Sequence, residues 1–139
     1  MVDGDGLGAG VCDQLTHRNY GRNLHEFHGG ANAADGQQYF NKRAEYWGLL
    51  LDWLKAGGEI PNDSELANDL TTPGFDHAHG NRFHGSIILE SKDDLKARGE
   101  ASLDNGDTLA MTFAVKVAAK AKPQYKNLYK ASPSALRPG

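Results

Sequence analysis

The segment from Gln38 to Ala56 constrains the fold more than any other part of the chain. Its apolar residues recur at helical spacing, which predicts one long amphipathic helix. Gly57-Gly58 then ends the helix, since glycine favours helix termination. A helix of this kind needs a surface that covers its apolar face. The residues of that face are Phe40, Ala44, Trp47, Leu51 and Leu54.

Short helices and short extended segments alternate around this helix. Helices are predicted over about 7–17, from Asp63 or Ser64 to Leu70, from Ser91 to Gly99, and from about Asp104 onward. Extended segments are predicted at 2–3, 23–28, 75–78 and 83–89, the last two as a hairpin. Strands and helices that interleave indicate an α/β fold with a small sheet flanked by helices.

Composition excludes several classes of protein. The 139 residues fit one domain, and no apolar run exceeds three residues, so no membrane span is expected. The residues after Met1 are acidic and glycine-rich rather than basic and apolar, so a signal peptide is not expected. The single cysteine, Cys12, agrees with a reducing compartment and is best interpreted as a buried thiol. We therefore expect a cytoplasmic protein.

Charge is distributed unevenly along the chain. Residues 1–107 hold all 18 acidic side chains and nine of the 15 basic ones, which gives this stretch a net charge of −9. The residues after 107 carry +6 and no acid. Such a basic segment is either a solvated tail or a contact for an anionic partner such as nucleic acid. The candidate DNA-binding residues are Lys116, Lys120, Lys122, Lys126 and Lys130.

Three acidic residues lie where local structure can direct them into a site. Asp3 lies at the carboxyl end of a predicted strand, before glycines that would permit a close backbone approach, where ligands bind in open α/β sheets. Asp104 and Asp107 are spaced to share a face at the start of the last helix. Clustered carboxylates suit Mg²⁺ or Mn²⁺. The alternative is that all three are turn or helix-cap residues.

Histidines offer a rival interpretation. His77 and His79 share a face of one predicted strand, and His84 on the returning strand could approach them. Three imidazoles could hold Zn²⁺, although surface histidines on a hairpin explain the same pattern. Trp47 and Trp53, on the strongly periodic helix, are assigned to core packing.

Five motifs follow one another along the chain. They are Val2-Asp3-Gly4-Asp5-Gly6-Leu7-Gly8-Ala9-Gly10-Val11, Phe27-His28-Gly29-Gly30-Ala31, Asn41-Lys42-Arg43-Ala44-Glu45 with Trp47, Leu89-Glu90-Ser91-Lys92-Asp93-Asp94, and Ser102-Leu103-Asp104-Asn105-Gly106-Asp107-Thr108-Leu109-Ala110. In this order they resemble the nuclease domain of tailed-phage terminase large subunits, over roughly residues 2–115. We assign residues 1–115 as a nuclease-like domain that lacks its N-terminal strands, and 116–139 as a basic tail.

The resemblance implies an incomplete RNase H-like fold and a Mg²⁺- or Mn²⁺-dependent DNA endonuclease. It implies that Asp3 and Asp107 are catalytic, with Asp104 as a further metal ligand. Duplex DNA, bound without sequence preference, and other phage packaging proteins are the implied partners, in a bacterial or phage-infected cell.

Two features of the family have no counterpart in this chain. The family has upstream strands that carry another essential carboxylate, and an ATPase motor. We therefore predict a terminase fragment, such as a prophage remnant, with weak or no activity alone. An exposed sheet edge favours self-association. The alternatives are a non-catalytic oligomeric module that binds DNA or protein, and a zinc-binding protein built on the three histidines.

Overall fold

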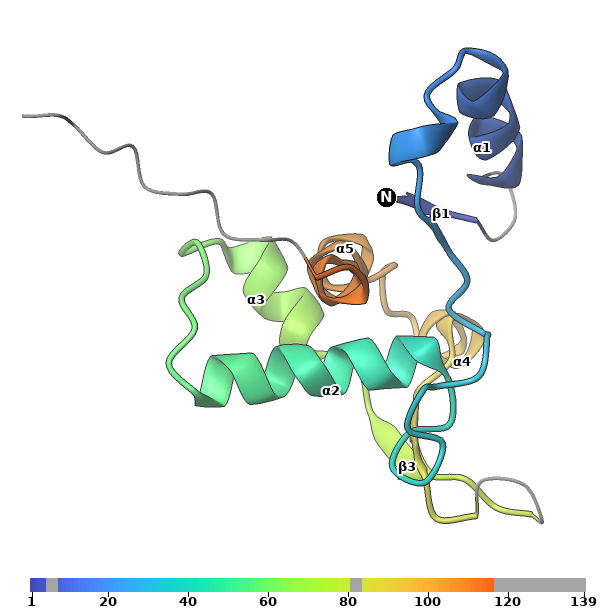
Figure 1. The fold of residues 1–139 in the computed structure, drawn as a ribbon. Coiled ribbons are helices and arrows are strands. Elements are labelled where there is room, and N and C mark those ends of the chain that lie inside the picture. The colour runs from blue at the N-terminus through green and yellow to red at the C-terminus, as the bar shows by residue number, and fades with distance from the viewer. Residues whose placement is uncertain (5–7, 81–83, 117–139) are drawn as a thin grey trace, which may run out of the picture.

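The computed structural model describes residues 1–4, 8–80 and 84–116. Helices and short strands alternate along these residues, as the sequence predicts (Figure 1). The elements in chain order are β1 (Val2–Asp3), α1 (Gly8–His17), the 3₁₀ turn η1 (Gly21–Asn23), β2 (Glu26–Phe27), α2 (Lys42–Lys55), α3 (Ser64–Thr71), β3 (Phe75–His77), β4 (Ile87–Leu89), α4 (Lys92–Ala97), α5 (Asp104–Met111) and the 3₁₀ turn η2 (Thr112–Ala114).

The strands form two small sheets. β1 pairs in parallel with β2, with Asp3 opposite Phe27, and β3 pairs antiparallel with β4, with Phe75 opposite Leu89. The predicted hairpin is confirmed, but its second strand is shorter than expected. It begins at Ile87 because Gly85 has a φ of +82°, outside the extended region.

The start predicted for the long helix was wrong. Residues 38–40 run alongside β4 instead: Ile87 N–H donates to Gln38 at 2.8 Å, and Phe40 N–H donates to Ile87 at 2.9 Å. The helix begins at Lys42, where the side-chain oxygen of Asn41 accepts the N–H of Ala44 at 2.9 Å. Hydrogen bonds to Ile87, which is distant in sequence, therefore hold residues 38–40 outside the helix despite their helical spacing.

α2 is the central helix of the larger part of the molecule. It packs against α5, β4 and η2, while α1 packs against β1 and η1 (Figure 1). Its buried face includes Ala44 and Leu50, whereas Leu51 is 50% exposed. The predicted face is confirmed at Ala44, which is buried, and at Trp47 and Leu54, which are half-buried, but it is wrong at Leu51, where Leu50 is the buried residue instead.

A hydrogen-bond network around Arg98 connects the end of α4 with Glu90 and with the segment that follows α3. Arg98 Nε and Nη2 donate to the two carboxylate oxygens of Glu90 at 2.7 and 2.9 Å, and Nη2 also donates to the carbonyl of Thr72 at 2.8 Å. Glu90 also accepts the N–H of Gly74 at 2.9 Å. The bonds from Arg98, followed by that from Gly74, lower the pKa of Glu90 from 4.5 to about 2.

This pKa shift predicts a pH-dependent part of the stability. A carboxyl with a lowered folded-state pKa stabilises the fold above pH 4.5, and that contribution is lost as the pH falls towards 2. We expect Glu90→Gln to lower the urea midpoint at pH 7 and to converge with the wild type near pH 2. Exposed Glu59→Gln is the control. A constant difference between Glu90→Gln and wild type across this pH range would contradict the assignment.

Candidate metal and nucleic-acid site

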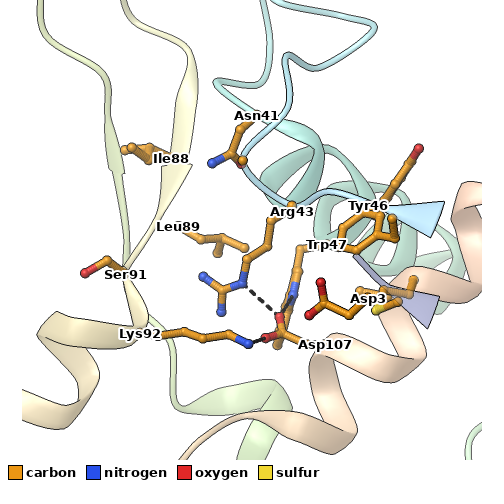
Figure 2. A pocket seen from close by; sticks show the side chains of 15 residues that line it. Asp3, Asn41, Arg43, Tyr46, Trp47, Ile88, Leu89, Ser91, Lys92 and Asp107 are labelled. Atoms are coloured by element: carbon orange, nitrogen blue, oxygen red, sulfur yellow. Dashed lines mark hydrogen bonds and ion pairs between the residues drawn. The ribbon is translucent and has the colours of Figure 1, made fainter. Parts of the chain in front are cut away.

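A pocket with a volume of about 270 Å³ lies where the ends of β1 and β2, the first half of α2, β4, the start of α4 and one side of α5 meet (Figure 2). It brings together residues that are far apart in sequence. Its polar side chains include Asp3, Asn41, Arg43, Trp47, Lys92 and Asp107.

Asp107 lies at the centre of the polar contacts in this pocket. Its Oδ1 accepts hydrogen bonds from Arg43 Nε at 2.8 Å and from Trp47 Nε1 at 2.9 Å. Its Oδ2 is 3.4 Å from Lys92 Nζ, in an ion pair. The side chain is only 14% exposed, so a buried carboxylate is balanced by two cations.

Two buried polar atoms in the pocket have no hydrogen-bond partner within the described part of the chain. They are Oδ2 of Asp107 and Nη2 of Arg43. Buried polar atoms are nearly always hydrogen-bonded, and exceptions often mark functional positions. Arg43 is itself held in place, since its Nη1 donates to the carbonyl of Glu90 at 2.8 Å.

Asp3 enters the same pocket from the end of β1. Figure 2 shows its carboxylate directed towards Asp107. The backbone at this point is close to α1: a Cβ on Gly8 would overlap the carbonyl oxygen of Asp3, and one on Gly4 would come within 2.6 Å of the His28 ring. The prediction that these glycines permit a close backbone approach is confirmed at Gly4 and Gly8 and is wrong at Gly10, where an added Cβ would have no atom within 4 Å.

Two neighbouring glycines of α1 give a matched test of this packing. Gly8→Ala would force Asp3 and α1 apart, and overpacking of this kind costs about 1–3 kcal/mol. Gly10, in the same helix, has no atom within 4 Å of an added Cβ, so Gly10→Ala should be neutral or stabilising by up to about 1 kcal/mol. Thermal unfolding of the two variants measures the difference. Equal effects would show that Gly8 does not hold Asp3.

Asp104 lies elsewhere. It is exposed and accepts a hydrogen bond from the Ser102 hydroxyl at 2.6 Å, and it does not line the pocket. Residues three apart on a helix still diverge by about 60°. Asp107 therefore points towards α2 while Asp104 faces solvent. The structure brings together two of the three predicted carboxylates.

The histidines of the rival interpretation are on the hairpin. His77 Nδ1 is 2.9 Å from the carbonyl of Gly85, and the rings of His79 and His84 are 6.5 Å apart between centroids. Within residues 1–4, 8–80 and 84–116, no three His, Cys, Asp or Glu side chains are grouped to hold a metal ion. Asp3 and Asp107 are therefore a carboxylate pair rather than a larger ligand cluster.

Of the predicted DNA-binding lysines, Lys116 is the one within the described residues. Lys116 is exposed. The other predicted DNA-binding residues, Lys120, Lys122, Lys126 and Lys130, lie outside the described residues.

None of the helices in the described ranges has the length and apolar character needed to span a membrane.

Three pocket residues are not indicated individually by the sequence pattern. The helical spacing predicts core packing for Trp47, and it predicts no individual role for Arg43 or Lys92. Arg43 and Trp47 are four residues apart, which places them on the same face of α2. An arginine and an indole N–H that share a helix face with buried residues are a signal for a buried acidic partner.

Comparison with known proteins identifies the fold. No model of a protein family and no curated protein matches the chain by sequence. Among solved structures, it is similar to a mutant nuclease domain of the large terminase subunit gp2 of bacterial virus Sf6, solved with manganese and β-thujaplicinol. The TM-score is 0.61 and the sequence identity 22%, with 83% of this chain and 64% of that chain covered.

The chain therefore has the fold of part of a phage large-terminase nuclease domain. This confirms the predicted class, a small α/β fold like that of part of a terminase nuclease domain. The match extends over less than two thirds of the length of that domain.

Proposed function

We propose that the chain is part of a phage DNA-packaging terminase large subunit, from its metal-dependent endonuclease domain. The observation that carries this proposal is the convergence of Asp3 and Asp107 on one pocket. The fold match supports it, because the similar domain was solved with manganese. Duplex DNA is the substrate class, and the chain alone has weak or no cleavage activity.

The pocket fits a hard divalent cation such as Mg²⁺ or Mn²⁺. Both prefer oxygen ligands, and Mg²⁺ is often held by one or two carboxylates while it keeps several waters. Asp3 and Asp107 would be these carboxylates, and the buried Oδ2 of Asp107 has no hydrogen bond among the described residues. When bound, such a metal would activate water and stabilise charge on a phosphodiester.

The side chains around the carboxylates have separate tasks. Arg43 and Trp47 both donate to Oδ1 of Asp107, which fixes the carboxylate, while Oδ2 makes an ion pair with Lys92 but accepts no hydrogen bond among the described residues. Lys92 is 47% exposed, so its ammonium group can also attract the phosphates of DNA. The pocket therefore provides both a cation-binding pair and positive charge for a polyanion.

Cleavage of supercoiled plasmid tests this function. With Mn²⁺ we expect the 139-residue chain to cut weakly or not at all, because two carboxylates supply too few ligands for a two-metal centre. Any cutting should be lost in both Asp3→Asn and Asp107→Asn. Efficient cutting that both variants abolish would show a complete site and contradict weak activity. Cutting that survives both variants would contradict the proposed site.

An oligomeric, non-catalytic module derived from the same domain is the second candidate. An apolar groove of about 350 Å³ between α2, α3 and the β3–β4 hairpin favours it, because Phe75 at its border is 70% exposed. Light scattering tests this candidate. We expect a mass above the 15.0 kDa of one chain, and a single monomeric species at high concentration would exclude self-association.

A further inference from the structure

The helix that carries Asp107 has no capping side chain of its own. Leu103 occupies the N-cap position of α5 and makes no side-chain cap hydrogen bond. The free N–H groups at the start of a helix need acceptors. Here the acceptor comes from another helix: Oδ2 of Asp69, on α3, accepts the N–H of Asn105 at 2.9 Å and of Gly106 at 3.1 Å.

Asp69 belongs to a buried contact between three helices. It is only 8% exposed, and an added Cβ on Gly106 would come within 3.0 Å of the Trp47 ring and 3.2 Å of the Asp69 Cβ. The first turn of α5 is therefore closely packed between Asp69 on α3 and Trp47 on α2. This packing restricts translation and rotation of that turn.

Asp107 directly follows Gly106 in this first turn of α5. Its N–H donates to the carbonyl of Leu103 at 2.8 Å, so it belongs to the same helical turn that Asp69 anchors. Its carboxylate contacts Arg43 and Trp47 on α2. The direction of the Asp107 side chain thus depends on where α3 and α2 hold the start of α5.

We propose that Asp69 is a positioning residue for the metal-binding carboxylate of Asp107. Asp69 does not line the pocket and acts only through the backbone of α5. Outer contacts that orient a ligand typically change metal affinity by about 10–100-fold when they are lost. This proposal rests on the proposed function, which makes Asp107 a metal ligand.

The chain offers a matched control for the substitution. Asp63, the N-cap of α3, also accepts two backbone N–H groups, from Glu65 and Leu66, both at 2.9 Å. Asp63→Ala therefore removes the same number of capping bonds as Asp69→Ala, but away from Asp107. Asp69→Asn keeps an acceptor oxygen and removes the charge, so it separates capping from electrostatics.

Two measurements on the full chain test the proposal. The indole N–H resonance of Trp47, recorded without metal, reports its hydrogen bond to Asp107, and calorimetry with Mn²⁺ reports affinity. We expect Asp69→Ala to shift the Trp47 resonance upfield and to weaken Mn²⁺ binding about tenfold or more. Asp69→Asn should restore most of both, and Asp63→Ala should change neither.

The proposal is overturned if folded Asp69→Ala leaves both readouts unchanged, or if Asp63→Ala changes them equally. If Asp69→Ala does not fold, Asp69→Glu takes its place: its longer side chain should displace α5 and shift the same resonance, and an unchanged resonance overturns the proposal. If the wild type binds no Mn²⁺, the proposed function fails, while the metal-free resonance still decides the role of Asp69.

Discussion

Asp107→Asn is expected to abolish measurable Mn²⁺ binding, with an affinity loss of more than about 100-fold, above that of an outer-sphere change. The substitution removes one of two pocket carboxylates and leaves Arg43 and Lys92 in excess, so the pocket gains net positive charge. The excess positive charge of Arg43 and Lys92 then repels a metal ion, and Asp3 is the one carboxylate left in the pocket lining. Calorimetric titration with Mn²⁺ measures the loss.

The neighbouring aspartate provides the control for this prediction. Asp104 lies on the same helical turn but is exposed and does not line the pocket, so Asp104→Asn should bind Mn²⁺ as the wild type does. An equal loss in Asp104→Asn would reinstate it as a ligand. Tight Zn²⁺ binding that disappears in a His77→Ala, His79→Ala double variant would favour the histidine site instead.

Truncation after Ala114 is expected to reduce DNA binding almost to nothing. The removed residues hold six of the 15 basic side chains and no acid, while residues 1–107 carry a net charge of −9 and should repel a polyanion. If about five of these cations contact phosphates, log affinity should fall with log salt at a slope of roughly −4 to −5. Fluorescence anisotropy with labelled duplexes measures affinity and slope.

Two further observations control the truncation. Duplexes of unrelated sequence should bind equally, because contacts to phosphates carry no sequence information. Replacement of Lys120, Lys122 and Lys126 by glutamine should lower the slope by about 3 without shortening the chain. If the truncated chain binds duplex DNA as well as the full chain, with the same slope, the prediction is contradicted. The DNA contact would then lie within residues 1–114.

The predictable parts of the fold depend on local chemistry. Asp63 and Ser91 cap α3 and α4 as their positions in the sequence indicate, because an N-cap needs only a side-chain acceptor and the next few N–H groups. The start of α2 was not predictable in this way. Residues 38–40 pair with Ile87, and a partner almost fifty residues away leaves no trace in helical spacing.

The same distinction applies to the candidate site. Asp3 and Asp107 could be selected because each lies at the end of a secondary-structure element, where side chains reach a pocket. Arg43 contacts Asp107 across 64 residues, and Asp69 contacts Asn105 across 36. These partners are defined only by how α2, α3 and α5 pack, so propensity and spacing do not identify them.

Asp107 is the proposed metal ligand, and Trp47 provides a probe at that carboxylate, since its indole N–H donates to Oδ1 at 2.9 Å. The chain has two tryptophans, so Trp53 serves as the internal reference and Trp53→Phe assigns the two indole resonances. The decisive measurement is a Mn²⁺ titration of the ¹⁵N-labelled chain. We predict that the Trp47 resonance broadens first, and that this effect is lost in Asp107→Asn. Equal broadening of both resonances, or broadening at Trp47 that survives Asp107→Asn, would contradict a metal site at Asp107.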